Sequence, residues 1–229
     1  MPPRSWRWPA GSAAPDSSTT SRSEKASTDA AAPPEPEQGL TLPNPSLRPT
    51  LPGWAVVTPE RLAHIERVAA LVDGWADAMG VPEPERQRWL KAVWLHDALR
   101  DASAADLERW APTTPGPPEL RHGPASAARA KSEGETDRGV LDAVRYHSVG
   151  LAEWDMAGRM LYCADFLEPG RDFAVERRAE LAARLPSDAA GVLREVARDR
   201  IKHMVASGWP IPEPTVRFWN SLAAAAARS

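Results

Sequence analysis

The sequence has 229 residues, of which 42% are hydrophobic and 26% charged, which is ordinary for one globular domain with a tail. The formal net charge of −3, without a basic block, argues against a nucleic-acid groove. The single cysteine, Cys163, excludes an internal disulfide and fits a reducing compartment. No apolar run approaches the roughly 20 residues that a membrane span needs, so we expect a cytoplasmic protein that binds neither nucleic acid nor membrane.

The first 50 residues differ in composition from the rest of the chain. They hold ten of the 24 prolines and 13 Ser or Thr, but no Val, Ile, Phe or His. Such a segment buries too little apolar surface to offset the entropy of ordering it. The sequence therefore predicts a disordered Pro/Ser/Ala-rich tail at 1–52 and a folded domain at 53–229. A start site assigned too far upstream would give the same composition.

From Gly53 onward the hydrophobic pattern is helical, without convincing period-two alternation. Thr58 and Pro59 form a good helix start, and apolar residues together with His64 then recur at helical spacing towards Gly80. Proline-rich stretches separate the later amphipathic segments, including a loop at 112–118. Further helices are expected at about 84–99, 102–110, 122–131, 137–147, 151–167, 173–185 and 187–207, and from 215 onward. The predicted fold class is all-α.

Four of the five histidines fall on separate predicted helices or at their ends. They are separated by 32, 26 and 25 residues: His64, His96, His122 and His147. Antiparallel packing can point one histidine from each helix into a shared cavity. His96 is followed directly by Asp97, and Asp165 comes 18 residues after the last of the four. Imidazole and carboxylate groups suit divalent first-row metals, and six ligands favour two ions sharing one carboxylate.

Spacing alone supports such a site only weakly, because a lone helical histidine is more often a core or surface residue. Asp97 is the better candidate for the shared carboxylate, since His96 fixes it beside the metals. His203 has no motif around it and is not expected to be a ligand. Trp110 and Trp154 are candidates to stack an adenine, although packing explains them equally well.

The segments around these residues are more specific than their spacing. They are Leu95–Arg100 (LHDALR), Arg121–Gly123 (RHG), Arg145–Gly150 (RYHSVG) and Tyr162–Arg171 (YCADFLEPGR), followed by Ile211–Leu222 near the C-terminus. Together they resemble the HD superfamily of metal-dependent phosphohydrolases. More narrowly they resemble the YqeK-type family, the bacterial symmetrical bis(5′-nucleosyl)-tetraphosphatases. The resemblance runs from about Gly53 to Leu222.

The resemblance implies an HD-domain helical bundle with two divalent or mixed-valence metal ions, iron in the resting protein and manganese as the alternative. It implies the cleavage of diadenosine tetraphosphate to two ADP through attack of a metal-bridging hydroxide. A homodimer is permitted. The implied ligands are His64, His96, Asp97, His122, His147 and Asp165.

Arg100, Arg171 and Glu168 are the further site candidates. The family usually has Lys where this chain has Arg100, so phosphate binding remains plausible there while proton donation does not, because Arg does not deprotonate. Arg171 can fork onto a phosphate or stay in solvent near a helix end. Glu168 is a candidate to contact substrate, to orient Arg171 or to orient a ligand histidine.

Two other functions fit the same residues. An HD phosphohydrolase acting on a nucleoside di- or triphosphate or on a cyclic nucleotide would use the same ligands. A non-catalytic nucleotide-binding module is the third reading, with the tail tethering a partner. Each of the six ligand positions carries a residue that can bind a metal, which favours a metal-binding hydrolase over a non-catalytic module.

Overall fold

The computed structural model describes residues 49–114 and 117–227 of the chain. Residues 1–48, most of the predicted disordered tail, lie outside the described residues. Leu51 already packs against the hydrophobic core. The folded domain therefore includes at least two residues before the predicted boundary at Gly53.

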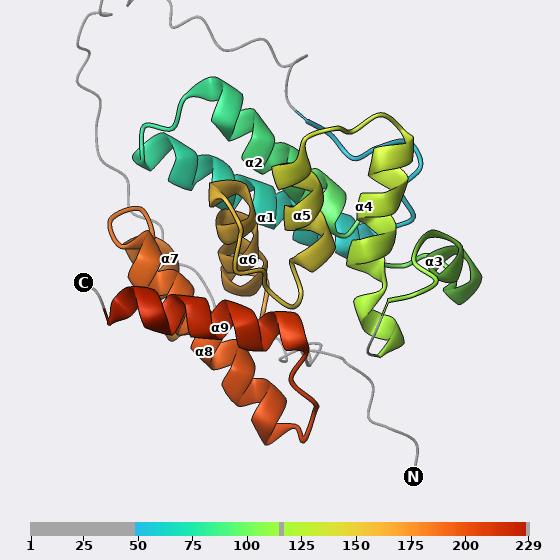
Figure 1. Cartoon of the computed structure of the whole chain (residues 1–229). Coiled ribbons are helices and arrows are strands. Elements are labelled where there is room, and N and C mark those ends of the chain that lie inside the picture. Colours follow the sequence, from blue (N-terminus) through green and yellow to red (C-terminus); the bar gives the residue numbers. More distant parts are fainter. Residues whose placement is uncertain (1–48, 115–116, 228–229) are drawn as a thin grey trace, which may run out of the picture.

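Within these two ranges every element of regular structure is helical, which confirms the predicted all-α class. The helices are α1 (Pro59–Ala78), α2 (Glu83–His96), α3 (Ala104–Trp110), the 3-10 helix η2 (Pro118–Leu120), α4 (His122–Ser132), α5 (Arg138–Tyr146), α6 (Met156–Leu167), α7 (Val175–Arg184), α8 (Ala189–Ala206) and α9 (Glu213–Ala226). Helix α6 lies at the centre and contacts α1, α2, α5, α7 and α8 (Figure 1).

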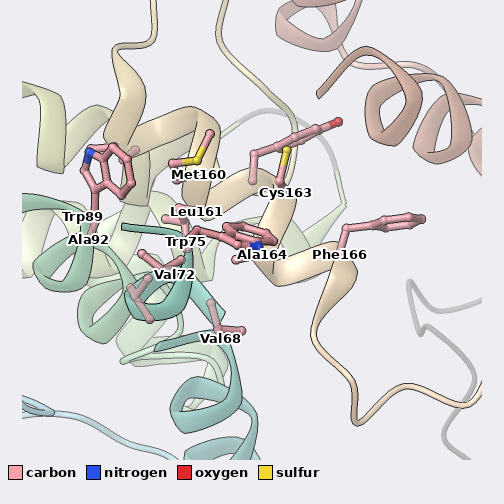
Figure 2. Close-up of a cluster of buried hydrophobic side chains, with 14 of the residues drawn as sticks. Val68, Val72, Trp75, Trp89, Ala92, Met160, Leu161, Cys163, Ala164 and Phe166 are labelled. Atoms are coloured by element: carbon pink, nitrogen blue, oxygen red, sulfur yellow. The ribbon is translucent and has the colours of Figure 1, made fainter. Parts of the chain in front are cut away.

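The core is formed where α1, α2 and α6 face one another. Figure 2 shows buried side chains from all three helices: Val68, Val72 and Trp75 of α1, Trp89 and Ala92 of α2, and Met160, Leu161, Cys163, Ala164 and Phe166 of α6. Trp75 and Trp89 are both buried. Burying each such side chain contributes about 1.5–3 kcal/mol, which is how this core fixes the three helices that carry the site.

Two predicted helix ends are wrong, and both errors concern the site. Helix α2 ends at His96 rather than near Leu99, because Asp97 leaves helical geometry with φ −109° and ψ 14°. Helix α6 begins at Met156 rather than Leu151, because the side chain of Asp155 accepts a hydrogen bond from the backbone N–H of Ala157 and starts the helix there.

The C-terminal helices gather on one side of the molecule, in orange to red in Figure 1. Helices α7 and α8 pack on α6, and α9 packs on α8. This arrangement brings α8 beside the helix that carries Asp165. None of the helices described combines the length and the apolar character that crossing a bilayer requires.

Candidate metal centre

A cavity of about 340 Å³ opens where the ends of the central helices meet. Five of the six predicted ligands line it: His64, Asp97, His122, His147 and Asp165. The sixth, His96, is fully buried, with its ring centroid 5.0 Å from that of His147 and 5.6 Å from that of His64. The structure thus brings together all six residues that the sequence singled out.

Helix ends supply most of this set. His96 is the last residue of α2, Asp97 follows it, and His122 is the first residue of α4. His147 stands directly after α5. Only His64 on α1 and Asp165 on α6 lie within a helix. Asp97 has left helical geometry, and a turn follows α2 at this point.

Asp97 stands between two pairs of histidines. Its Oδ2 atom lies 3.8 Å from Nε2 of His64 and 3.6 Å from Nε2 of His96. Its Oδ1 atom lies 3.2 Å from Nε2 of His122 and 3.6 Å from Nε2 of His147. Each carboxylate oxygen therefore faces one pair. The ligand atoms form two groups that could each hold an ion, and they share Asp97.

The orientation of three histidines is fixed by one repeated contact. Nδ1 of His96, His122 and His147 lies 2.6–2.7 Å from the carbonyl oxygen of the residue three positions earlier. A carbonyl oxygen only accepts, so Nδ1 carries the proton and donates it. The lone pair of each ring is then on Nε2, the atom that faces Asp97. This is how proteins commonly orient metal-binding histidines.

Converging lone pairs need a positive charge between them. Nε2 of His122 lies 3.0 Å from Nε2 of His147, although the contact that fixes each Nδ1 leaves neither Nε2 with a proton to donate. Nε2 of His64, Nε2 of His96 and Oδ1 of Asp97 are buried without a hydrogen-bond partner. Unpaired buried acceptors are costly. Divalent cations suit this donor set and would satisfy it.

The ionisation states fit the same interpretation. Burial lowers the pKa of His96 to about 3 and that of His122 to about 4, so both rings are neutral at pH 7. Burial alone would raise the pKa of the Asp97 carboxyl, but the guanidinium of Arg61 beside it helps to hold the pKa well below its ordinary value. Neutral imidazoles around an ionised carboxylate are the forms that bind a metal.

Glu168 is a partner of His64. Its Oε1 atom lies 3.2 Å from Nδ1 of His64, and its Oε2 atom accepts from Nε of Arg67 at 2.6 Å and from the backbone N–H of Gly170 at 2.7 Å. Glu168 is only 2% exposed. Burial would raise its pKa, but these contacts lower it to about 2. This placement favours orientation of His64 over contact with substrate.

Arg171 and Arg200 hold the carboxylate of Asp165 from two sides. Nη2 of Arg171 donates to Oδ1 and Nη2 of Arg200 donates to Oδ2, both at 2.9 Å. Arg171 also donates to the backbone carbonyl of Asp165. Oδ1 lies 3.3 Å from Nε2 of His64, which joins Asp165 to the first histidine pair. The guanidinium of Arg171, predicted to contact a phosphate, therefore donates to the carboxylate of Asp165 in this structure.

Sequence reasoning missed Arg61 and Arg200. Nη1 of Arg61 donates to Oδ2 of Asp97 at 2.8 Å. Arg61 lies three residues before His64 on α1 and so shares its helix face, which was a usable signal. Arg200 is 4% exposed and continues the apolar face of α8 after Val196. A charged residue on such a face is rarely buried without a partner.

Arg100, a predicted phosphate contact, lines the cavity beside His122. Its Nη1 donates to the carbonyl oxygen of Glu119 at 3.0 Å and lies 3.1 Å from Nδ1 of His122. The same carbonyl oxygen accepts from His122. Arg100 therefore supports a ligand histidine while its guanidinium borders the cavity.

The cavity wall as a whole is rich in charge of both signs. Its lining includes five arginines and six acidic residues, which leaves one formal negative charge with the histidines neutral. A polyanion is not attracted to such a wall by itself. Two divalent cations would make it net positive, so the charge of the lining also fits metal binding.

Gly123 explains the His-Gly pair of the sequence. A Cβ added to it would lie 3.0 Å from the carbonyl oxygen of Val144, 3.1 Å from that of Arg145 and 3.1 Å from Cε1 of His147. The absence of a side chain therefore lets the start of α4 approach the end of α5. His122 and His147 meet because of this close approach.

The two tryptophans considered for base stacking lie outside the cavity lining. Trp154 is 4% exposed and packs against Tyr162 and Phe218 at ring-centroid distances of 5.5 and 5.4 Å. Trp110 packs under the guanidinium of Arg129 at 4.8 Å. His203 belongs to neither histidine group, but it does line the cavity.

Comparison with known proteins places the chain in a family. Residues 61–175, half of the chain, match the family model described as HD domain. A crystal structure of a "predicted HD superfamily hydrolase involved in NAD metabolism" from Clostridium acetobutylicum has a similar fold, with a TM-score of 0.64 and 21% identity. That likeness covers 74% of this chain and 92% of the other, and at this identity it shows the fold alone.

Three curated relatives carry one name, "Bis(5'-nucleosyl)-tetraphosphatase, symmetrical". The chain is 30% identical over 107 residues to the Bacillus subtilis (strain 168) protein, covering 46% of this chain and 56% of that one. It is 28% identical over 105 residues to the Halalkalibacterium halodurans protein, covering 45% and 55%. The Staphylococcus aureus protein is 39% identical over 54 residues, or 23% and 28%. The chain thus spans about half the length of the first two. Because the HD domain model matches half of its residues, the chain belongs to the HD domain family.

Proposed function

We propose that this protein is a metal-dependent phosphohydrolase that cleaves diadenosine tetraphosphate symmetrically into two ADP. The observation that carries the proposal is the position of Asp97, whose two oxygens each face one pair of histidines. This is a ligand set for two ions that share a carboxylate. Two bound divalent ions, iron or manganese, would activate water and neutralise phosphate charge.

The chain's own groups would position the substrate. Arg100 and Arg171 border the cavity and can donate to phosphate oxygens. Arg100 also shares the carbonyl oxygen of Glu119 with His122, and Arg171 also donates to Asp165. Guanidinium groups suit this task because their fork matches phosphate geometry and stays charged. Arg61 and Arg200 hold the ligand carboxylates and so keep both ion positions defined.

The substrate assignment rests on the names of the relatives, because the ligand set alone fixes only the reaction class. Symmetrical cleavage requires attack at an inner phosphorus, with an ADP moiety accommodated on each side of the ions. Product analysis tests this directly. The full-length protein with Mn²⁺ or Fe²⁺ should convert diadenosine tetraphosphate to ADP alone, resolved by anion-exchange chromatography.

AMP plus ATP as products would contradict symmetrical cleavage. Absence of turnover, together with hydrolysis of a nucleoside di- or triphosphate or a cyclic nucleotide from a substrate panel, would replace the substrate but keep the reaction class. Chelator-treated protein serves as the control and should be inactive until Mn²⁺ or Fe²⁺ is restored.

A further inference from the structure

The cavity extends beyond the metal ligands along helix α8. Three residues from the end of that helix and the turn after it line the same cavity: His203, Met204 and Trp209. They stand beyond Arg200, which holds Asp165. His203 follows Arg200 by three residues, or about 4.5 Å along the helix axis, on a neighbouring face. This part of the wall therefore leads outward from the ligand carboxylate.

Trp209 is held there by the way α8 ends. Gly208 has a φ of +68°, a conformation open to glycine at little cost. The backbone N–H of Gly208 donates to the carbonyl of Val205 at 3.0 Å, and that of Trp209 donates to the carbonyl of Met204 at 2.9 Å. These paired bonds form a Schellman motif, which turns the chain back over the last helical turn. Trp209 is thus fixed by backbone geometry.

His203 supports the indole from the side. The two ring centroids lie 5.2 Å apart with an interplanar angle of 84°, an edge-to-face arrangement. Both residues are partly exposed. Met204, the next residue on α8, is buried. An aromatic pair therefore borders the cavity, whose lining otherwise consists mainly of arginines, histidines and carboxylates.

We infer that Trp209, supported by His203, stacks the nucleobase of one nucleotide moiety of the substrate. The inference rests on the proposed function, because it takes the phosphates to lie at the ions and Arg171. A nucleotide bound in that direction has its base farthest from the metals, along α8. Aromatic stacking accepts any base because each has a π-face. The site is thus a purine-tolerant subsite for a nucleoside diphosphate.

Binding of the product ADP tests the inference without catalysis. The Mn²⁺ complexes of ADP, GDP and pyrophosphate are titrated into the full-length, Mn²⁺-loaded protein by calorimetry. The variant Trp209→Leu keeps an apolar side chain but removes the π-face. We expect it to weaken ADP and GDP binding by about 5-fold or more, from the range for losing one stacked base, and to leave pyrophosphate binding unchanged.

Two further variants make the result specific. Trp209→Phe restores a stacking surface and should bind ADP within about 3-fold of the wild type. Trp219→Leu is the matched control, because Trp219 lies on α9 in a separate groove with Arg198 and Val205. It should leave both ADP and pyrophosphate binding unchanged. Thermal unfolding of each variant checks that α8 and α9 stay packed.

Equal weakening of ADP and pyrophosphate in Trp209→Leu would overturn the inference, since it would show a general disturbance of the cavity. Unchanged ADP binding in that variant would overturn it as well. Failure of the proposed function has a different signature. In that case the wild-type protein leaves diadenosine tetraphosphate intact, while the dependence of ADP binding on Trp209 is still measured independently.

Discussion

At the scale of single residues, the position of Asp97 carries most of the functional argument. A carboxylate whose oxygens face separate histidine pairs can satisfy two ions at once, which an amide cannot do because its nitrogen carries no lone pair for a metal. We predict that Asp97→Asn loses bound metal and falls at least about 100-fold in activity, more than the 10–100-fold typical of a supporting group. Elemental analysis and turnover of the same preparation check this.

Asp77→Asn is the control for that change, because Asp77 is 82% exposed in its side chain and lies at the far end of α1 from Thr58. It should keep both metal and activity. Full metal loading of Asp97→Asn would show that the shared ligand has been misassigned.

Glu168 tests a role in orienting a ligand. In Glu168→Gln the amide oxygen still accepts from His64, but the amide nitrogen cannot accept from Arg67. We expect metal affinity to fall by about 10–100-fold with the six ligands intact, measured by competition with a chelator. Glu176→Gln, at an exposed position in the first turn of α7, should bind metal like the wild type. Equal affinity of Glu168→Gln and wild type would contradict the orienting role.

The sequence motifs singled out six candidate ligands, which the fold brings together, but not the residues that hold them in position. Histidine and aspartate carry chemistry that a motif preserves, so His96 and Asp97 can be found from the chain alone. Arg61 could also have been found, because it shares a helix face with His64. Arg200 could not be placed, because its contact with Asp165 joins residues 35 positions apart and depends on how α8 packs on α6.

At the scale of elements, the site depends on close approach of helix ends. Gly123→Ala would place a Cβ 3.0–3.1 Å from two carbonyl oxygens and from the ring of His147. We expect the free energy of unfolding to fall by about 1–3 kcal/mol from overpacking, and metal affinity to fall as His122 and His147 separate. Urea unfolding and chelator competition measure the two effects.

Gly74→Ala is the matched control within α1. A Cβ there meets nothing within 4 Å, and the residue is exposed. Alanine in a helix interior is about 0.5–1 kcal/mol more favourable than glycine, so this variant should be slightly stabilised. A Gly123→Ala protein with wild-type stability and metal affinity would show that α4 and α5 are not limited by this contact.

The start of α5 has a pH-dependent ion pair. Nε and Nη2 of Arg88 donate to the two oxygens of Asp137 at 2.6 and 3.0 Å, and Asp137 also accepts from the N–H of Val140. The hydrogen bond with Arg88 is the main cause that lowers the pKa of Asp137 to about 2. A lowered folded-state pKa contributes stability at neutral pH that is lost as pH falls from about 4 to about 2.

Asp137→Asn isolates this effect, because Asn caps a helix about as well as Asp but carries no charge. We expect the variant to be less stable than the wild type at pH 7, with the difference shrinking between about pH 4 and pH 2. Urea unfolding at each pH measures it. A stability difference that stays constant over this range would contradict the contribution of the ion pair.

The helices themselves were predictable where caps and periodicity agree, as at Thr58 and Asp137. The end of α2 was not, since Asp97 continues the helical spacing of Leu90, Val93 and Trp94. The turn at Asp97 is stabilised by a contact with a distant residue, the hydrogen bond from Arg61. Tertiary contacts of this kind override local propensity, and a pattern within one segment does not contain them.

At the scale of the whole molecule, the core of α1, α2 and α6 positions the candidate ligands of the first metal ion. Helices α4 and α5 position the two histidines of the second. The all-α class followed from composition and periodicity, and the order of motifs along the chain predicted the family. The subsite along α8 was not predictable, because Trp209 reaches the cavity only through the turn at Gly208. Sequence reasoning had considered Trp110 and Trp154, which the fold places elsewhere.

The central claim is that one chain holds two metal ions around Asp97. The most direct measurement is the number of metal equivalents per chain, determined by elemental analysis of the full-length protein reconstituted with Fe²⁺ or Mn²⁺ and freed of excess metal. We predict about two equivalents in the wild type, as a pair of ions sharing one carboxylate requires. A stoichiometry of one, or none with phosphohydrolase activity retained, would contradict the dinuclear centre.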